Sequence, residues 1–177
     1  MTTKVFLGLI LTAGIVSFNP AFAKSNINWL LSENALGPIQ VGMTVAEAEK
    51  ASQKKFVLNP LTPPIETEAC RFATLENGPK KVFFMLNDGI IVRIDIKNPA
   101  IKTTGGFHLG SNAQDIKKQY KGKIEAYPNK YEEDKDTLVV TPDPTTNNRF
   151  VFDTDGEKIL YIRAGRTPQV EYVEGCS

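Results

Sequence analysis

The chain has 177 residues, of which 23% are charged, and its formal net charge is +1. This near balance argues against nucleic acid as a partner, because nucleic-acid binding depends on a strong excess of basic residues. No polybasic cluster marks a membrane-surface face either, and the length fits one compact domain or two small lobes that share a core.

The N-terminal segment, residues 1–23, has the three parts of a secretory signal peptide. A short basic start with Lys4 precedes an apolar run over residues 5–18, and an A-x-A end closes at Ala23. The run is shorter than the roughly 20 residues of a spanning helix, which leaves a single membrane anchor as the less favoured alternative. No Cys follows the A-x-A end, which argues against a lipid-modified N-terminus. We expect cleavage between Ala23 and Lys24, and a periplasmic or secreted product without stable membrane insertion.

Two cysteines are present, Cys70 and Cys176. In an oxidising compartment an even cysteine count indicates a disulfide, so we expect one bond between them. Two buried free thiols and a bridge to another chain are the alternatives. Because the chain has a single His, the usual four-ligand Cys/His zinc site cannot be assembled. We expect no metal and no cofactor.

Two stretches of the chain recur at a nearly constant offset, which indicates an internal duplication. The first match places Gly42 over Gly110, 68 residues later, together with the apolar residues before each glycine. The second places the Asp-Gly pair of residues 88–89 over that of residues 155–156, 67 residues later. We therefore expect two tandem repeats that form one compact unit, residues 24–100 and residues 101–177.

The two halves show the same order of expected elements. Each begins with a short apolar strand, around residues 39–41 or 107–109, and continues with a helix, over residues 45–54 or 113–121. Thr44 and Glu47 have the spacing of a capping box before the first helix, and Asn112 with Asp115 is a weaker version before the second. Three strands follow each helix, over residues 69–75, 81–86 and 90–96, and over residues 138–141, 149–153 and 159–163. The sequence thus predicts an α+β fold of two tandem repeats, each a short helix packed on an antiparallel sheet of three to four strands.

Alternation in the last strand of each half assigns its side chains to two faces. The expected buried face, covered by the helix, holds Ile90, Val92, Ile94 and Ile96 in the first half and Leu160 and Ile162 in the second. The other face holds Ile91 and Ile159 together with four polar or aromatic residues, Arg93, Asp95, Tyr161 and Arg163. These four form the candidate binding face, and the alternative is an ordinary solvated sheet face.

The order of strand, G-[MS]-[TN] turn, helix and antiparallel strands resembles the tandem-repeat fold of the β-lactamase inhibitory protein family. It also resembles the small lipoproteins of the outer-membrane assembly machinery, where a similar Gly-Met-Thr turn opens the helical part. Most of the mature chain is similar to a group of exported bacterial proteins of unassigned function. The inhibitor family typically closes a disulfide within each repeat, whereas Cys70 and Cys176 lie in different halves, and the lipoproteins' modified Cys is missing. The resemblance therefore implies a fold and an open sheet face that meets a partner, but neither inhibitor activity nor an assembly role.

No pattern of catalytic residues occurs in the sequence. There is no G-x-S-x-G or G-x-G-x-x-G motif, and the glycine-rich residues 105–111 lack the Lys of a phosphate loop. His108 is expected to be a half-exposed strand residue rather than a general base. We assign no catalytic residue and expect a non-enzymatic binding module of the cell envelope, whose partner is an unknown protein or envelope component. The alternatives are a structural envelope accessory and an enzyme or enzyme subunit of unrecognised type, since paired carboxylates could still meet in the fold.

Overall fold

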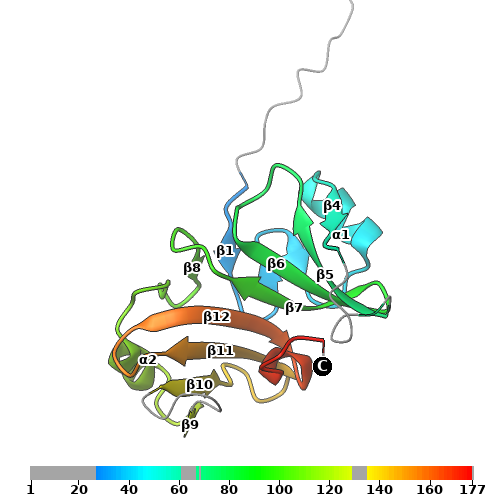
Figure 1. Ribbon diagram of the computed structural model, residues 1–177. Helices are drawn as coiled ribbons and strands as arrows, with labels where there is room; N and C mark the ends of the chain where they lie inside the picture. Colours follow the sequence, from blue (N-terminus) through cyan, green and yellow to red (C-terminus); the bar gives the residue numbers. More distant parts are fainter. Residues whose placement is uncertain (1–26, 61–66, 68, 129–134, 177) are drawn as a thin grey trace, which may run out of the picture.

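The computed structural model describes residues 27–60, 67, 69–128 and 135–176 (Figure 1). The predicted signal peptide and its cleavage site between Ala23 and Lys24 lie outside the described residues.

A single eight-stranded antiparallel sheet takes four strands from each half of the chain (Figure 1). The β7 and β12 strands pair at the seam between the halves, with Asp95 opposite Arg163. In spatial order the strands are β4 (Phe56–Leu58), β5 (Cys70–Leu75), β6 (Val82–Asn87), β7 (Ile90–Ile96), β12 (Ile159–Arg166), β11 (Asn148–Thr154), β10 (Asp136–Val140) and β9 (Ile124–Pro128).

A second, smaller sheet also joins the two halves. Its strands lie in the order β3 (Ile39–Gln40), β2 (Ala35–Leu36), β1 (Leu30–Leu31) and β8 (Lys102–Thr103), and the pairing of β1 with β8 is parallel. The apolar side chains of this sheet pack on one face of the large sheet and close the core. Core residues come from both halves and include Leu31, Leu36, Ile39, Phe84, Ile94, Ile96, Phe107, Ile116, Phe150, Phe152 and Ile162.

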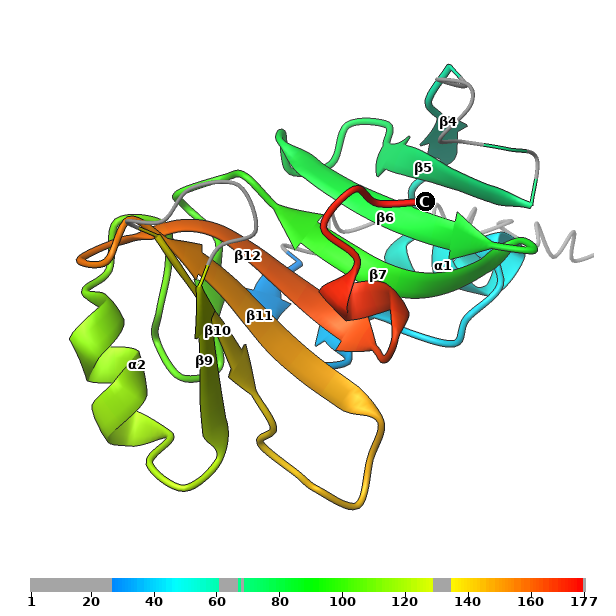
Figure 2. The same cartoon turned by 60° about the horizontal axis from the view of Figure 1, so that its bottom comes forward.

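The two predicted helices are present and start at the predicted residues. The α1 helix (Val45–Ser52) begins with the predicted capping box, in which Thr44 accepts from the Glu47 backbone and the Glu47 carboxylate accepts from the Thr44 backbone. The α2 helix (Ala113–Gln119) begins at Asn112, whose side chain accepts from a backbone N–H. The α1 helix contacts β3 and is seen behind β6 and β7 in Figure 2, and α2 lies beside β9 and β10 (Figures 1 and 2). A short 3₁₀ helix, η1 (Gln169–Glu171), follows β12.

The predicted α+β fold of two helix-on-sheet repeats is wrong. The chain is mostly β, with 42% strand and 13% helix, and it forms two shared sheets rather than one sheet for each half. Pairing of β7 with β12 merges the strands of both halves, and the strand expected at residues 39–41 pairs in the small sheet. Residues 107–109, also expected as a strand, are in none, although Phe107 is buried in the core.

The glycine turns before the two helices make equivalent hydrogen bonds. The Gly42 backbone donates to the Ile91 carbonyl at 2.7 Å, and the Gly110 backbone donates to the Ile159 carbonyl at 2.8 Å. Donors and acceptors are both 68 residues apart, which is the offset of the first sequence match. Each turn is thus docked on the first residues of the last strand in its half.

Candidate functional site

A β-bulge in each half changes which residues of the last strand face the core. In the pairing of β6 with β7, Val92 has no partner residue on the adjacent strand. Leu160 has none in the pairing of β11 with β12. Because one extra residue inverts the alternation, Ile91 and Ile159 lie in the core instead of on the predicted open face. Leu160, predicted to be buried, is 44% exposed. Beyond the bulges the predicted burial of Ile94, Ile96 and Ile162 is confirmed.

The structure brings the four candidate binding residues together at the seam of the large sheet, on the face away from the core. The Arg93 guanidinium forms an ion pair with Asp95, with Nη2 and Oδ1 2.7 Å apart. The Tyr161 hydroxyl donates to the same carboxylate. The Arg163 Nη2 donates to both carboxylate oxygens of Asp153, at 2.9 and 3.0 Å. The four residues predicted to share a face therefore do lie together, and the sequence did not indicate that Asp153, Phe72 and Lys97 also contact them.

The expectation that this face is open to solvent is wrong, because the C-terminal segment, residues 167–176, covers it. The exposed fractions of Arg93, Asp95 and Arg163 are 2%, 1% and 2%. The segment lies across β12 and β7 and continues over β6 towards β5 (Figure 2). Two of its carbonyl groups, those of Gln169 and Tyr172, accept hydrogen bonds from the buried guanidinium groups.

Burial and neighbouring charges shift the pKa values of two members of the cluster, Arg93 and Tyr161. Burial acts to lower the pKa of Arg93, but Asp95 and Tyr161 together outweigh burial, and the pKa lies above its ordinary value. Burial, followed by the charge of Asp95, raises the pKa of Tyr161 well above its usual range. Arg93 therefore stays charged and Tyr161 stays neutral, which fits a structural role for the cluster under the C-terminal segment.

The predicted disulfide fixes the last described residue of the C-terminal segment to the large sheet. Cys70 at the start of β5 and Cys176 are joined by a disulfide, with their Cα atoms 5.5 Å apart. The C-terminal segment is therefore attached at both ends, through the chain to β12 and through the disulfide to β5.

A groove remains open on the same sheet face, between the C-terminal segment and the strands β9, β10 and β11. We call it the outer groove. Its volume is about 260 Å³, and its lining residues are Tyr127, Pro128, Thr137, Val139, Val151, Arg163, Glu171 and Val173. Sequence reasoning missed this groove because it predicted neither β9 nor the return of the C-terminal segment.

The floor of the outer groove is a row of residues that lie opposite one another on adjacent strands. Glu125 of β9 lies opposite Val139 of β10, which lies opposite Val151 of β11, which lies opposite Arg163 of β12. At the rim, Tyr127 and Val173 are 49% and 52% exposed. The middle of the floor is therefore apolar, and the rim carries Tyr127 and Val173 together with the carboxylate of Glu171.

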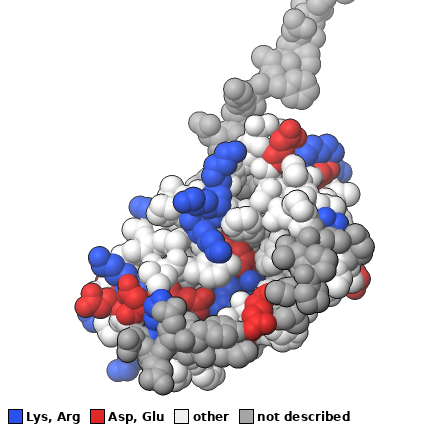
Figure 3. Space-filling view, viewed as in Figure 1, with Lys and Arg blue, Asp and Glu red and all other residues white. Residues whose placement is uncertain are grey.

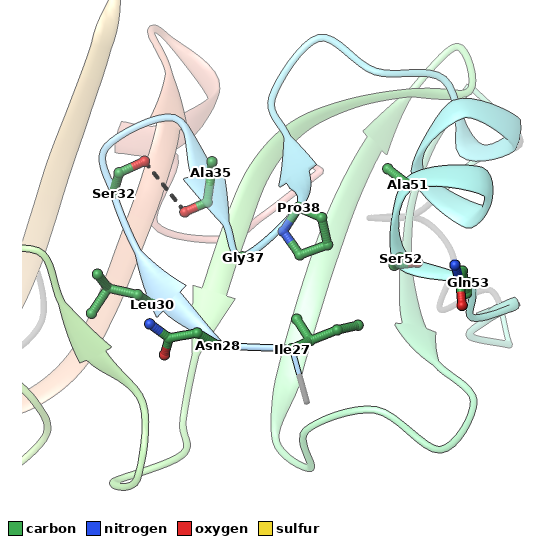
Figure 4. A pocket seen from close by; sticks show the side chains of 10 residues that line it. All are labelled: Ile27, Asn28, Leu30, Ser32, Ala35, Gly37, Pro38, Ala51, Ser52 and Gln53. Carbon is green, nitrogen blue, oxygen red and sulfur yellow. Dashed lines mark hydrogen bonds between the residues drawn. The ribbon is translucent and has the colours of Figure 1, made fainter. Parts of the chain in front are cut away.

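A second, larger pocket of about 540 Å³ lies between the strands β1 and β2 and the end of α1 (Figure 4). Its walls include Leu30, Ala35, Pro38 and Ala51, and all of its lining residues are uncharged. None of these lining residues has a side chain that could act as a general acid or base.

Other chemistry-bearing residues are dispersed. His108 is half-buried beside its own turn, with Nδ1 2.8 Å from the Leu109 carbonyl oxygen, and it lines neither pocket. Within the described ranges, no three His, Cys, Asp or Glu side chains are grouped so that they could hold a metal ion.

In the same ranges we find no helix with the length and apolar character needed to cross a membrane. On the face in Figure 3, acidic and basic side chains are interspersed among uncharged ones.

The chain matches no protein-family model and no curated protein. Among solved structures, it is similar to the uncharacterized protein yfeY from Escherichia coli, with a TM-score of 0.51 and 15% sequence identity. The match covers 77% of this chain and 99% of that chain. At this identity the similarity shows a shared fold alone.

Proposed function

We propose that the chain is an exported, non-enzymatic binding protein of the cell envelope that recognises a partner protein through the outer groove. The observation that carries the proposal is the exposed pair Tyr127 and Val173 beside an apolar floor. At about 260 Å³ the groove is smaller than the roughly 300–1,000 Å³ of ordinary small-molecule sites. It has the size to receive one or two side chains of a protein, which is how interface anchors bind.

Export is supported by the signal-peptide pattern and by the disulfide between Cys70 and Cys176, a bond of oxidising compartments. We expect a periplasmic or secreted product that begins at Lys24. The intact mass of the exported protein tests this. A product that still carries residues 1–23 would contradict it.

Site-specific photo-crosslinking tests the binding function. A photoreactive amino acid replaces Val173 in the mature protein, and the control replaces Val57 of β4, which is similarly exposed (49%) at the opposite edge of the sheet. In envelope extract we expect a discrete protein crosslinked from position 173 and not from position 57. The additional substitution Tyr127→Ala should remove that product. Equal crosslinking from positions 173 and 57 would contradict a role for the groove. So would a crosslinked product that persists when Tyr127→Ala is added.

A further inference from the structure

We infer that the outer groove receives a basic side chain, Lys or Arg, of the partner protein. Its aliphatic part packs on the valines of the groove and its cation lies between Glu171 and Tyr127. This inference rests on the proposed binding function and specifies the chemistry of the partner.

The apolar floor fits the stem of a long side chain. Val139 and Val151 lie opposite each other on adjacent strands, and Val173 faces the same groove from the C-terminal segment. Lys and Arg bury their methylene groups against such surfaces while the charged end stays near solvent. A groove that is apolar below and acidic at the rim matches this distribution of polarity.

In and beside the groove, the described basic side chain has a counter-ion, whereas the described carboxylates have none. Arg163, the basic residue of the lining, already has its counter-ion, since Nη2 contacts Asp153 at 2.9 Å. Glu171 of the lining and the neighbouring Glu125 have no cationic partner among the residues that the structure describes. Among the residues that the structure describes, the uncompensated charge of the lining and of Glu125 is therefore negative.

Tyr127 contacts one of these carboxylates, that of Glu125, and feels the charge of the other, that of Glu171. Its hydroxyl donates to Glu125, and this hydrogen bond, together with the charges of Glu125 and Glu171, raises the pKa of Tyr127. The hydrogen bond holds the half-exposed aromatic ring at the rim. A cation beside it would be attracted by both carboxylates and could also interact with the ring face. An acidic side chain would be repelled at this rim, and a neutral one would leave both carboxylates unpaired.

Nuclear magnetic resonance titration of the ¹⁵N-labelled protein of residues 24–177 tests the inference. The probe is Nα-acetyl-lysine methylamide, and the matched control is Nα-acetyl-norleucine methylamide, whose stem lacks the ammonium group. We expect saturable shifts of the Val139 and Val173 amides with the lysine probe. Its affinity should exceed that of the norleucine probe by roughly fivefold, as one partly exposed ion pair provides.

Two variants isolate the charge. Glu171→Gln should reduce the preference for the lysine probe over the norleucine probe, and Glu125→Gln together with Glu171→Gln should abolish it. Glu76→Gln, the same change at an exposed position in the other half, should have no effect. Equal binding of the two probes, or no saturable shift at the groove with the lysine probe, would overturn the inference. If crosslinking from position 173 still succeeds in that case, the binding function stands and only the basic partner residue is excluded.

Discussion

Arg93 of β7 and Arg163 of β12 donate to the same carbonyl oxygen, that of Tyr172, at 2.7 and 2.9 Å. The two arginines lie on the two strands that join the halves of the large sheet. One carbonyl of the C-terminal segment is therefore held by both halves at once. Because each guanidinium also pairs with a carboxylate, the charges are compensated where the segment excludes water.

Arg93→Ala is expected to be strongly destabilising. It would leave the Asp95 carboxylate, which is 1% exposed, without its ion-pair partner. Removing one partner of a buried pair costs about 3–5 kcal/mol, whereas a solvated sheet face would have predicted about 0.5 kcal/mol or less. The free energy of unfolding from denaturant melts measures the effect.

Lys118→Ala provides the matched control, because Lys118 forms an exposed ion pair with Asp115 in α2. Removing that pair should cost no more than about 1 kcal/mol. Equal losses in the two variants would show that the buried cluster contributes no more than a surface pair.

Ile159 and Leu160 should respond in opposite ways to truncation, although they are neighbours in β12. Ile159 is 1% exposed in the core and Leu160 is 44% exposed at the bulge. Ile159→Ala is therefore expected to cost about 2–5 kcal/mol, and Leu160→Ala about 0.5 kcal/mol or less. Denaturant melts of the two variants measure both losses in the free energy of unfolding. Simple alternation without a bulge predicts the opposite result, with the larger loss for Leu160→Ala.

Features that depend on a few neighbouring residues could be predicted from the sequence. The capping box of Thr44 and Glu47 marks the start of α1, and the Asp-Gly turn of residues 88–89 marks the hairpin of β6 and β7. The turn pattern works because Asp88 and Gly89 both adopt positive φ, at 49° and 75°. These signals lie within four residues, so no long-range contact is needed to interpret them.

Features that depend on distant pairing could not be predicted. A bulge adds one residue to a strand without a clear mark in its composition, yet it moved Ile91 and Ile159 to the opposite face. The merging of the two halves depends on β7 and β12, which are more than sixty residues apart. The four residues of the candidate binding face were grouped correctly, but their burial depends on the C-terminal segment, whose sequence has no strand or helix periodicity.

Gly165→Ala is expected to loosen the seam between the halves. A Cβ atom at Gly165, whose φ is +151°, would lie 2.4 Å from the Val92 carbonyl oxygen and 2.8 Å from the Arg93 Cα. Both are backbone atoms, so relief requires β7 and β12 to separate, at a cost of about 1–3 kcal/mol. Hydrogen exchange should accelerate for amides of β7 and β12 and remain unchanged between β9 and β10. Uniform acceleration, or none, would contradict a local clash.

Reduction of the disulfide between Cys70 and Cys176 is expected to destabilise the protein by up to about 4.7 kcal/mol, since the bond closes a loop with a sequence separation of 106. Arg93 and Arg163 hold the Tyr172 carbonyl independently, so residues 173–176 should be released first. Denaturant melts and hydrogen exchange with and without reductant measure both effects, and the double variant Cys70→Ser, Cys176→Ser should match the reduced protein. Two free thiols in the untreated protein would refute the pairing, and a covalent dimer on a non-reducing gel would show that the bond joins two chains.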